Sequence, residues 1–227
     1  MQKQSSSETG SSALTLTTPT DIGEASQRRR ITEAMIGSCS EKSFAGTTIT
    51  DIVARARISR TTFYKHFPDK RACFDATVEL CVEELSEAAR SAHSPGDPPP
   101  EAVRKATIAI LEAMAARPAL TQLLTADAVS VDPPVVERYR RLVIPALEGL
   151  WEAAGAPRRS QLDPRLAFGR AQLLIFRQIA AGRSDRLLEL LPEIVYLAVA
   201  PFAGHEAALE QAQLAEKDAD RDRADGD

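Results

Sequence analysis

The chain has 227 residues, enough for one large domain or two small ones with a sizeable buried core. It has no run of about eighteen apolar residues that could span a membrane, and its polar start lacks the apolar segment of a secretory signal. Three cysteines without a CxxC pair argue against a disulfide framework or a zinc finger. We therefore expect a globular protein in a reducing cytoplasm, and the net charge of -4 taken alone disfavours nucleic-acid binding.

Proline and glycine divide the chain into segments rich in Ala, Leu, Glu and Arg, with apolar residues at helical spacing and no alternating strand pattern. The pattern predicts an all-α fold with roughly nine or ten helices and no internal repeat. We expect a disordered tail over 1–25, a small N-terminal module over 26–71, a larger helical domain over 72–215 and a disordered charged tail over 216–227.

The charge is distributed unevenly among these segments. Residues 26–71 hold ten basic and four acidic residues, a surplus of +6, whereas residues 1–25 carry −2 and residues 72–227 carry −8. Such asymmetry suggests a basic head that binds a polyanion, attached to an acidic body that repels it.

The basic module is expected to contain three helices, over 26–39, 49–55 and 60–67. The first has an apolar face, and Phe44 anchors the loop after it. Thr47 or Thr48 can cap the second helix, and Thr48 and Asp51 have the spacing of a capping box. Ser59 can cap the third helix, which follows a tight turn. Two short helices joined in this way predict a helix-turn-helix, whose second helix can enter the major groove of DNA.

The third predicted helix separates buried from exposed side chains. Phe63 and Phe67, spaced i and i+4, are expected to pack against Ile31 and Ile52. The outward residues would be Arg60, Thr61, Tyr64 and Lys65. A guanidinium can bridge the O6 and N7 atoms of guanine, Thr can touch a thymine methyl, and Tyr and Lys can reach phosphate. The N-termini of the second and third helices also offer backbone N–H groups to phosphate.

The segment TTITDIVARARISRTTFYKHFPDK, from Thr47 to Lys70, resembles the N-terminal DNA-binding domain of the TetR family of one-component transcriptional regulators. The resemblance implies a helix-turn-helix domain followed by a helical ligand-binding and dimerisation domain, and a homodimer that binds a palindromic operator in double-stranded DNA. It also implies that Tyr64 and His66 lie at the DNA and that Lys70 meets phosphate. Arg60 and Thr61 occupy positions that usually vary with the operator.

The residues expected to bind DNA are Thr47, Thr48, Arg57, Ser59, Arg60, Thr61, Thr62, Tyr64, Lys65, His66 and Lys70. The family usually has Gly where Arg57 and Ser43 stand, so both are expected to need positive φ at a cost of about 1 kcal/mol. Arg57 would add a phosphate contact in return.

The larger domain contains two especially apolar helices, over 163–182 and 186–200, each apolar on more than one face. They resemble the two C-terminal helices that pair into an intersubunit four-helix bundle in this family. The small residues Gly169, Ala171 and Ala180 would allow close approach.

A small-molecule pocket is expected between the head and these two helices. Its candidate residues are Met114, Leu120, Leu123, Leu124, Tyr139, Trp151, Phe168, Gln172 and Phe176. Each could equally be ordinary core, which is the more frequent role of such residues. Arg177 and Arg170 could meet an anionic ligand, although an ion pair is the more frequent role. The scarcity of polar residues predicts a hydrophobic effector without identifying it.

Two other classes of protein remain as alternatives. An enzyme has little support, because the sequence lacks HExxH, GxSxG, P-loop and GxGxxG motifs, and no cofactor or metal is expected. Cys73 and Cys81 could form a redox switch, but buried inert thiols are the usual case. A helical interaction module with a basic face, for a protein partner or a membrane surface, would show no base-sequence preference. The favoured interpretation is a repressor that leaves its operator when a ligand shifts the fourth helix, which starts with Lys70 and Arg71. An activator is the alternative.

Overall fold

The computed structural model describes residues 19–127, 141, 144–145, 148–149, 151–152 and 160–225. This part of the chain consists of nine α-helices, a π-helix and a 3-10 helix, and contains no β-strand. The all-α prediction is therefore confirmed.

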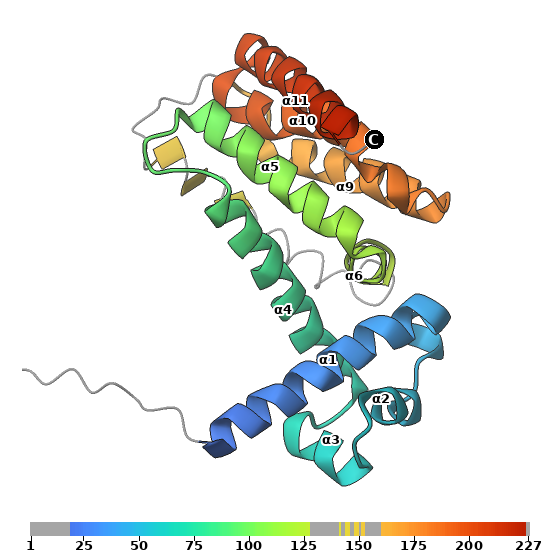
Figure 1. Ribbon diagram of the computed structural model, residues 1–227. Coiled ribbons are helices and arrows are strands. Elements are labelled where there is room, and N and C mark those ends of the chain that lie inside the picture. Colours follow the sequence, from blue (N-terminus) through green and yellow to red (C-terminus); the bar gives the residue numbers. More distant parts are fainter. Residues whose placement is uncertain are drawn as a thin grey trace, which may run out of the picture.

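The N-terminal module, the head, comprises α1 (Pro19–Gly46), α2 (Ile49–Ala56) and α3 (Arg60–His66) (Figure 1). Its core is formed by Ile31, Ile52 and Phe63, all fully buried, with Phe67 beside Phe63 at a ring-centroid distance of 5.9 Å. The predicted burial of both phenylalanines is thus confirmed.

The caps of α2 and α3 form as their sequences predict. Thr48 Oγ1 accepts a hydrogen bond from the N–H of Asp51 at 3.2 Å, and Asp51 Oδ2 accepts one from the N–H of Thr48 at 2.9 Å. Ser59 Oγ accepts from the N–H of Thr62 at 3.0 Å. Each cap contributes about 1 kcal/mol by satisfying N–H groups that the helix leaves free.

The first helix is longer than predicted at both ends. It begins at Pro19, inside the expected tail, and continues past Cys39 to Gly46. A break occurs at Ser43, whose φ of 57° and ψ of 169° are not helical. The N–H of Phe44, next to this break, bonds to Asp127, 83 residues away in sequence. No local pattern could predict such a partner.

The remaining elements are α4 (Lys70–Ser91), α5 (Pro99–Ala116), α6 (Pro118–Gln122), η1 (Leu123–Asp127), α9 (Pro164–Ala180), η2 (Ser184–Leu190), α10 (Leu191–Ala203) and α11 (His205–Asp225). Figure 1 shows α4 running from the head towards α5, α9, α10 and α11, which group together. These four helices, with α6, η1, η2 and the turn at Arg117, are called the body. One apolar cluster continues from the head through α4 into α5, α6, η1 and α10. A second cluster joins α5, α10 and α11.

The C-terminal segment corrects the prediction of a disordered tail over 216–227. Helix α11 continues to Asp225 and buries Ala208, Ala212 and Ala215. Arg104 of α5 holds it further, by donating to Gln211 Oε1 at 3.1 Å and pairing with Asp218. The buried alanines lie before residue 216, and the charged composition of 216–227 concealed that the helix continues beyond them.

The three cysteine thiols are buried and free. Burial raises the pKa of Cys39 to about 11 and that of Cys73 and Cys81 to about 12. Their thiols therefore stay protonated and poorly nucleophilic near neutral pH. Among the helices that the structure describes, none is long and apolar enough to cross a membrane, and the same residues contain no cluster of metal-ligating side chains.

We predict that Arg57→Gly stabilises the protein. Arg57 has φ of 53°, as its position in the turn predicted, and glycine reaches such angles at no steric cost, so the free energy of unfolding should rise by about 1 kcal/mol. Thermal unfolding measures the change. The control is Ala54→Gly, at an exposed position within α2. This substitution should lower the free energy of unfolding by about 1 kcal/mol, because glycine is a poor helix former. Equal destabilisation by both substitutions would contradict the strain at Arg57.

Candidate nucleic-acid interface

The outer face of α3 carries the four side chains expected to point away from the core. Arg60, Thr61, Tyr64 and Lys65 are all exposed, and Tyr64 reaches 52% exposure despite its aromatic ring. The opposite face of α3 carries Phe63, which is buried in the core of the head. The outer face of α3 therefore presents the cationic side chains of Arg60 and Lys65 and the hydroxyl groups of Thr61 and Tyr64. These groups are suited to contact with base edges and phosphates.

Neighbouring helices orient α3 from both sides. The Arg60 guanidinium donates to Thr50 Oγ1 of α2 at 2.6 Å. At the other end of α3, His66 Nε2 lies 3.1 Å from Gln27 Oε1 of α1. These contacts hold the helix ends while leaving Thr61, Tyr64 and Lys65 exposed.

Thr47, just before α2, was expected to bind DNA but is buried. This residue is only 1% exposed, its hydroxyl donates to the Ser43 carbonyl at 2.7 Å, and its own carbonyl accepts from Lys70. Its polar groups thus stabilise the connection between α1 and α2 and are not displayed at the surface. Thr48, one residue later, is the exposed N-cap. The remaining predicted residues Arg57, Ser59 and Thr62 lie at the turn and the start of α3.

Lys70 links the start of α4 to the head. Its ammonium group donates to the carbonyls of Phe44 and Thr47, both at 2.8 Å, and lies 4.2 Å from the centroid of the Phe44 ring. A phosphate contact could use only the remaining N–H of this half-buried group. Lys70 therefore has a structural role that the sequence did not predict.

The body holds the same connection through a buried carboxylate. Asp127, 4% exposed at the end of η1, accepts from the N–H of Phe44 at 2.8 Å through Oδ1, while its buried Oδ2 has no hydrogen-bond partner. Desolvation raises the pKa of this carboxyl. Further along α1, Arg117 of the body donates to both carboxylate oxygens of Glu33, at 2.8 and 3.0 Å. The sequence did not predict these contacts, because each joins segments more than 80 residues apart.

A cavity of about 560 Å³ lies in the body between α4, α5, α9 and α10. Its wall is mostly apolar, and the hydroxyls of Ser86 and Thr107 donate to backbone carbonyls of their own helices at 2.8 and 2.7 Å. The charged lining residues, together with His93, all come from α4 or its end: Glu79, Glu83, Arg90 and His93. Such a cavity is suited to a largely apolar molecule.

Three of the predicted pocket residues, Met114, Phe168 and Gln172, line this cavity. Leu120, Leu123 and Leu124 do not; they belong to the core that α6 and η1 form with the head. Trp151 is buried and stacks on Phe202 with ring centroids 5.4 Å apart. Phe176 is exposed on α9, and Tyr139 lies outside the described residues. Val82, Leu85 and Ala89 of α4 also line the cavity and were not predicted, although their helical spacing places them on one face.

We predict that Asp127→Asn stabilises the protein increasingly as pH rises. The raised pKa means that native Asp127 binds its proton at a higher pH than the unfolded chain, whose Asp titrates near 3.8. The stability that protonated Asp127 contributes is therefore lost as the pH rises from the pKa of the unfolded chain through the raised native pKa. An Asn at this position has no proton to lose, so its contribution does not change. Urea unfolding over a pH series from about 4 to 8 measures the difference. Asp127→Ala, which removes the acceptor of the Phe44 N–H, should destabilise at every pH by about 1–3 kcal/mol. A pH-independent difference between wild type and Asp127→Asn would contradict the raised pKa.

Comparison with known proteins relates this architecture to a family. Residues 31–77 match the sequence model of the bacterial regulatory proteins of the tetR family. A comparison with curated protein sequences finds no match.

Solved structures extend the likeness over most of the chain. The fatty acid degradation regulator FadR from Bacillus halodurans is 17% identical, with a TM-score of 0.63 over 76% of this chain and 94% of the other. FadR from Bacillus subtilis, solved in complex with stearoyl-CoA, is 15% identical, with a TM-score of 0.59 over 78% and 98%. A TetR family transcription regulator from Marinobacter aquaeolei VT8 is 20% identical, with a TM-score of 0.57 over 86% and 97%. The head of this chain therefore resembles the DNA-binding domain of the tetR family, and its fold is that of the TetR-family transcription regulators among these structures.

Proposed function

We propose that the protein is a homodimeric repressor that binds a palindromic operator and leaves it when a hydrophobic effector enters the body. The observation that carries the proposal is the outer face of α3, where Arg60, Thr61, Tyr64 and Lys65 are exposed together on a helix fixed by buried Phe63. The surplus of positive charge in the head supports duplex binding there, and the acidic body disfavours contact elsewhere.

The apolar stripe of α9 supports a dimer. Leu162, just before α9, and Leu166, Leu173 and Phe176 on it are exposed, with Leu166 at 70% and Leu173 at 55%. Their spacing places them on one face, and a side chain at Gly169 would meet no atom within 4 Å, so another helix has room to approach closely. Helix α10, the second helix expected in the interface, is instead buried against α5, α9 and α11. We therefore assign the dimer contact to α9.

The cavity supports an effector with a long apolar part. The hydroxyl groups of Ser86 and Thr107 donate to backbone carbonyls, so away from Gln172 and the charged residues of α4 the wall offers a ligand mainly apolar contact. FadR from Bacillus subtilis, which shares the fold, was solved with stearoyl-CoA, and we extend that class of ligand, a long acyl chain on a polar carrier, to this cavity. The charged residues of α4 would lie near the polar end of such a molecule.

Helix α4 connects the cavity to the head and can transmit a displacement between them. Its second half lines the cavity, and its first residue, Lys70, bonds to the carbonyls of Phe44 and Thr47 in the head. A ligand that displaces α4 would move the head and change the separation of the two α3 helices. Half-sites about 34 Å apart, one turn of DNA, would then no longer be matched. Reciprocity requires operator DNA to weaken effector binding by the same factor.

The test selects operator sequences from random duplex DNA with the full chain and then measures release by stearoyl-CoA. We expect a palindrome to be enriched, and Arg60→Ala to lose about 1–3 kcal/mol of binding and relax selection at one position of each half-site. Ala171→Phe, which fills the cavity, should keep operator binding and abolish release. Arg186→Ala, which removes an exposed guanidinium from the body, is the control. Duplex binding without base preference would contradict the proposal and favour an interaction module with a basic face.

The dimer assignment predicts that Leu173→Glu dissociates the protein, because the interface would have to bury an unpaired carboxylate. Sedimentation at micromolar concentration measures the change, and operator affinity should fall with it. Leu209→Glu, at a comparably exposed leucine of α11, should remain dimeric. Dissociation by Leu209→Glu alone would move the interface to α11.

A further inference from the structure

Helix α10 contains a proline, Pro201, close to its end at Ala203. In an α-helix the N–H of each residue donates to the carbonyl four residues earlier, so residue 201 would normally donate to the carbonyl of Leu197. Proline has no N–H, and the Leu197 carbonyl therefore lacks its helical donor. Helical bonding continues beyond the proline, because the N–H of Gly204 donates to the Ala200 carbonyl at 3.2 Å.

The Leu197 carbonyl belongs to the wall of the cavity between α4, α5, α9 and α10. Leu197 and Pro201 both line this cavity, and both are buried. A helical carbonyl points along the axis towards the residue four positions later, so this oxygen lies between the two residues on the same face of α10. Among the described residues, no side chain donates a hydrogen bond to Leu197. The wall thus offers a ligand a backbone acceptor that has lost its usual donor.

This acceptor differs from the hydroxyl groups of the wall. Ser86 and Thr107 already donate to backbone carbonyls of their own helices, at 2.8 and 2.7 Å. A buried carbonyl without a donor is costly, and so is a buried hydroxyl of a ligand without an acceptor. Each removes the cost of the other when the two meet. The Leu197 carbonyl therefore favours a ligand that brings a hydrogen-bond donor to this point of an otherwise apolar surface.

The acceptor lies towards one end of the cavity. Val103, near the start of α5, shares an apolar cluster with Phe202, near the end of α10. Leu111, near the end of α5, belongs instead to the cluster of Ile194, near the start of α10. The two helices therefore run in opposite directions, and Leu197 and Pro201 lie towards the start of α5. The end of α4, where His93 lines the cavity, precedes that start in the chain.

We propose that the effector carries a hydroxyl group on its acyl chain, close to the polar carrier, and that this hydroxyl donates to the Leu197 carbonyl. The inference rests on the proposed function and narrows its ligand class from a long acyl chain to a hydroxylated one. A hydroxyl brings a single O–H that needs an acceptor, and the carbonyl freed by Pro201 supplies it. An unmodified chain would leave the carbonyl unpaired, and a hydroxyl elsewhere on the chain would be buried without a partner.

The chain contains its own reporter for ligands in the cavity. Trp151 is the single tryptophan of the sequence and stacks on Phe202, which lines the cavity. The test titrates the full chain, without DNA, with stearoyl-CoA and with its 3-hydroxy and 12-hydroxy derivatives, and follows the tryptophan fluorescence. The 3-hydroxy isomer should bind at least as tightly as stearoyl-CoA and about ten-fold or more tightly than the 12-hydroxy isomer, which buries its hydroxyl without an acceptor.

Pro201→Ala isolates the role of the free carbonyl. Alanine restores the N–H at position 201, which then donates to the Leu197 carbonyl and removes the acceptor. The variant should bind stearoyl-CoA and lose the preference between the two hydroxy isomers. Thermal unfolding checks that it is folded, and alanine is the better helix former.

Two matched variants change the same cavity without restoring that N–H. Ile194→Val trims the wall on α10 itself, and Gln172→Leu removes the amide of α9 that offers another acceptor. Both should keep the preference for the 3-hydroxy isomer.

Three outcomes would overturn the inference: equal binding of the two isomers by the wild type, a preference that survives Pro201→Ala, or a preference that is lost in Gln172→Leu, which would assign the acceptor to the Gln172 amide. Failure of the proposed function gives different results. If none of the three molecules binds, its effector class is wrong and this inference falls with it. If no palindrome is selected, the repressor assignment fails while the isomer preference, measured without DNA, stands.

Discussion

Phe44 contributes three contacts at the junction between the head and the body. Its N–H donates to Asp127 of η1 and its carbonyl accepts from Lys70 of α4. Its ring lies against Phe74, with centroids 4.5 Å apart, and beneath the Lys70 ammonium. One residue thus joins the break in α1, the start of α4 and the end of η1. Any movement of α4 or η1 must be transmitted to this point, because buried backbone groups cannot lose their partners cheaply.

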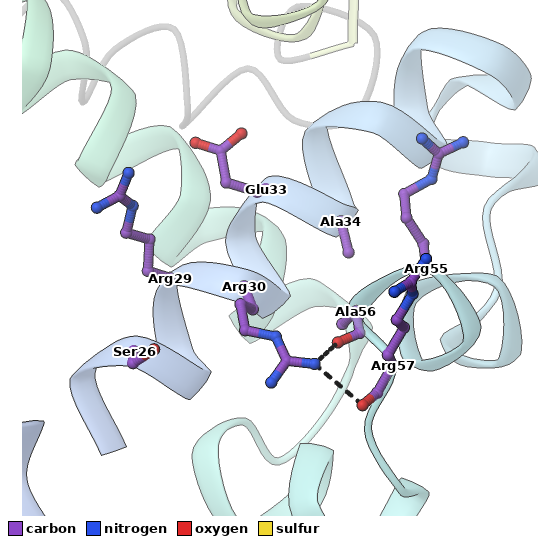
Figure 2. A pocket seen from close by; sticks show the side chains of 8 residues that line it. All are labelled: Ser26, Arg29, Arg30, Glu33, Ala34, Arg55, Ala56 and Arg57. Carbon is purple, nitrogen blue, oxygen red and sulfur yellow. Dashed lines mark hydrogen bonds between the residues drawn. The ribbon is translucent and has the colours of Figure 1, made fainter. Parts of the chain in front are cut away.

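The charges of the head fall into two sets with different physical roles. Arg60 and Lys65 lie on α3 and face outward, where they can meet a duplex. Arg30 and Lys70 instead donate to backbone carbonyls of the protein itself, as Figure 2 shows for Arg30, because helix ends and breaks leave carbonyls that need donors. The net charge of the head does not distinguish cations exposed on α3 from cations bonded to backbone carbonyls. The geometry therefore changes the interpretation of the basic head, since only part of its charge is available to DNA.

Local chemistry explains why much of the head was predictable. Thr48, Asp51 and Ser59 cap their helices through neighbours three residues away, and Phe63 and Phe67 share one face because of helical periodicity. Thr47 was not predictable in the same way, since its burial depends on the break at Ser43. The part of helix α11 after Ala215 was predicted to be disordered, because its charged sequence does not show that Asp218 pairs with Arg104 of α5.

The sequence by itself determined an all-helical chain, a helix-turn-helix head and the residues on the outer face of α3, because these follow from interactions within a few residues. Tertiary structure decided the contact between Asp127 and Phe44, the composition of the cavity and the burial of α10. These features join segments far apart in the chain, and their partners are selected by packing and by the need to satisfy buried polar groups. Periodicity along one helix contains no information about which other helix will cover it.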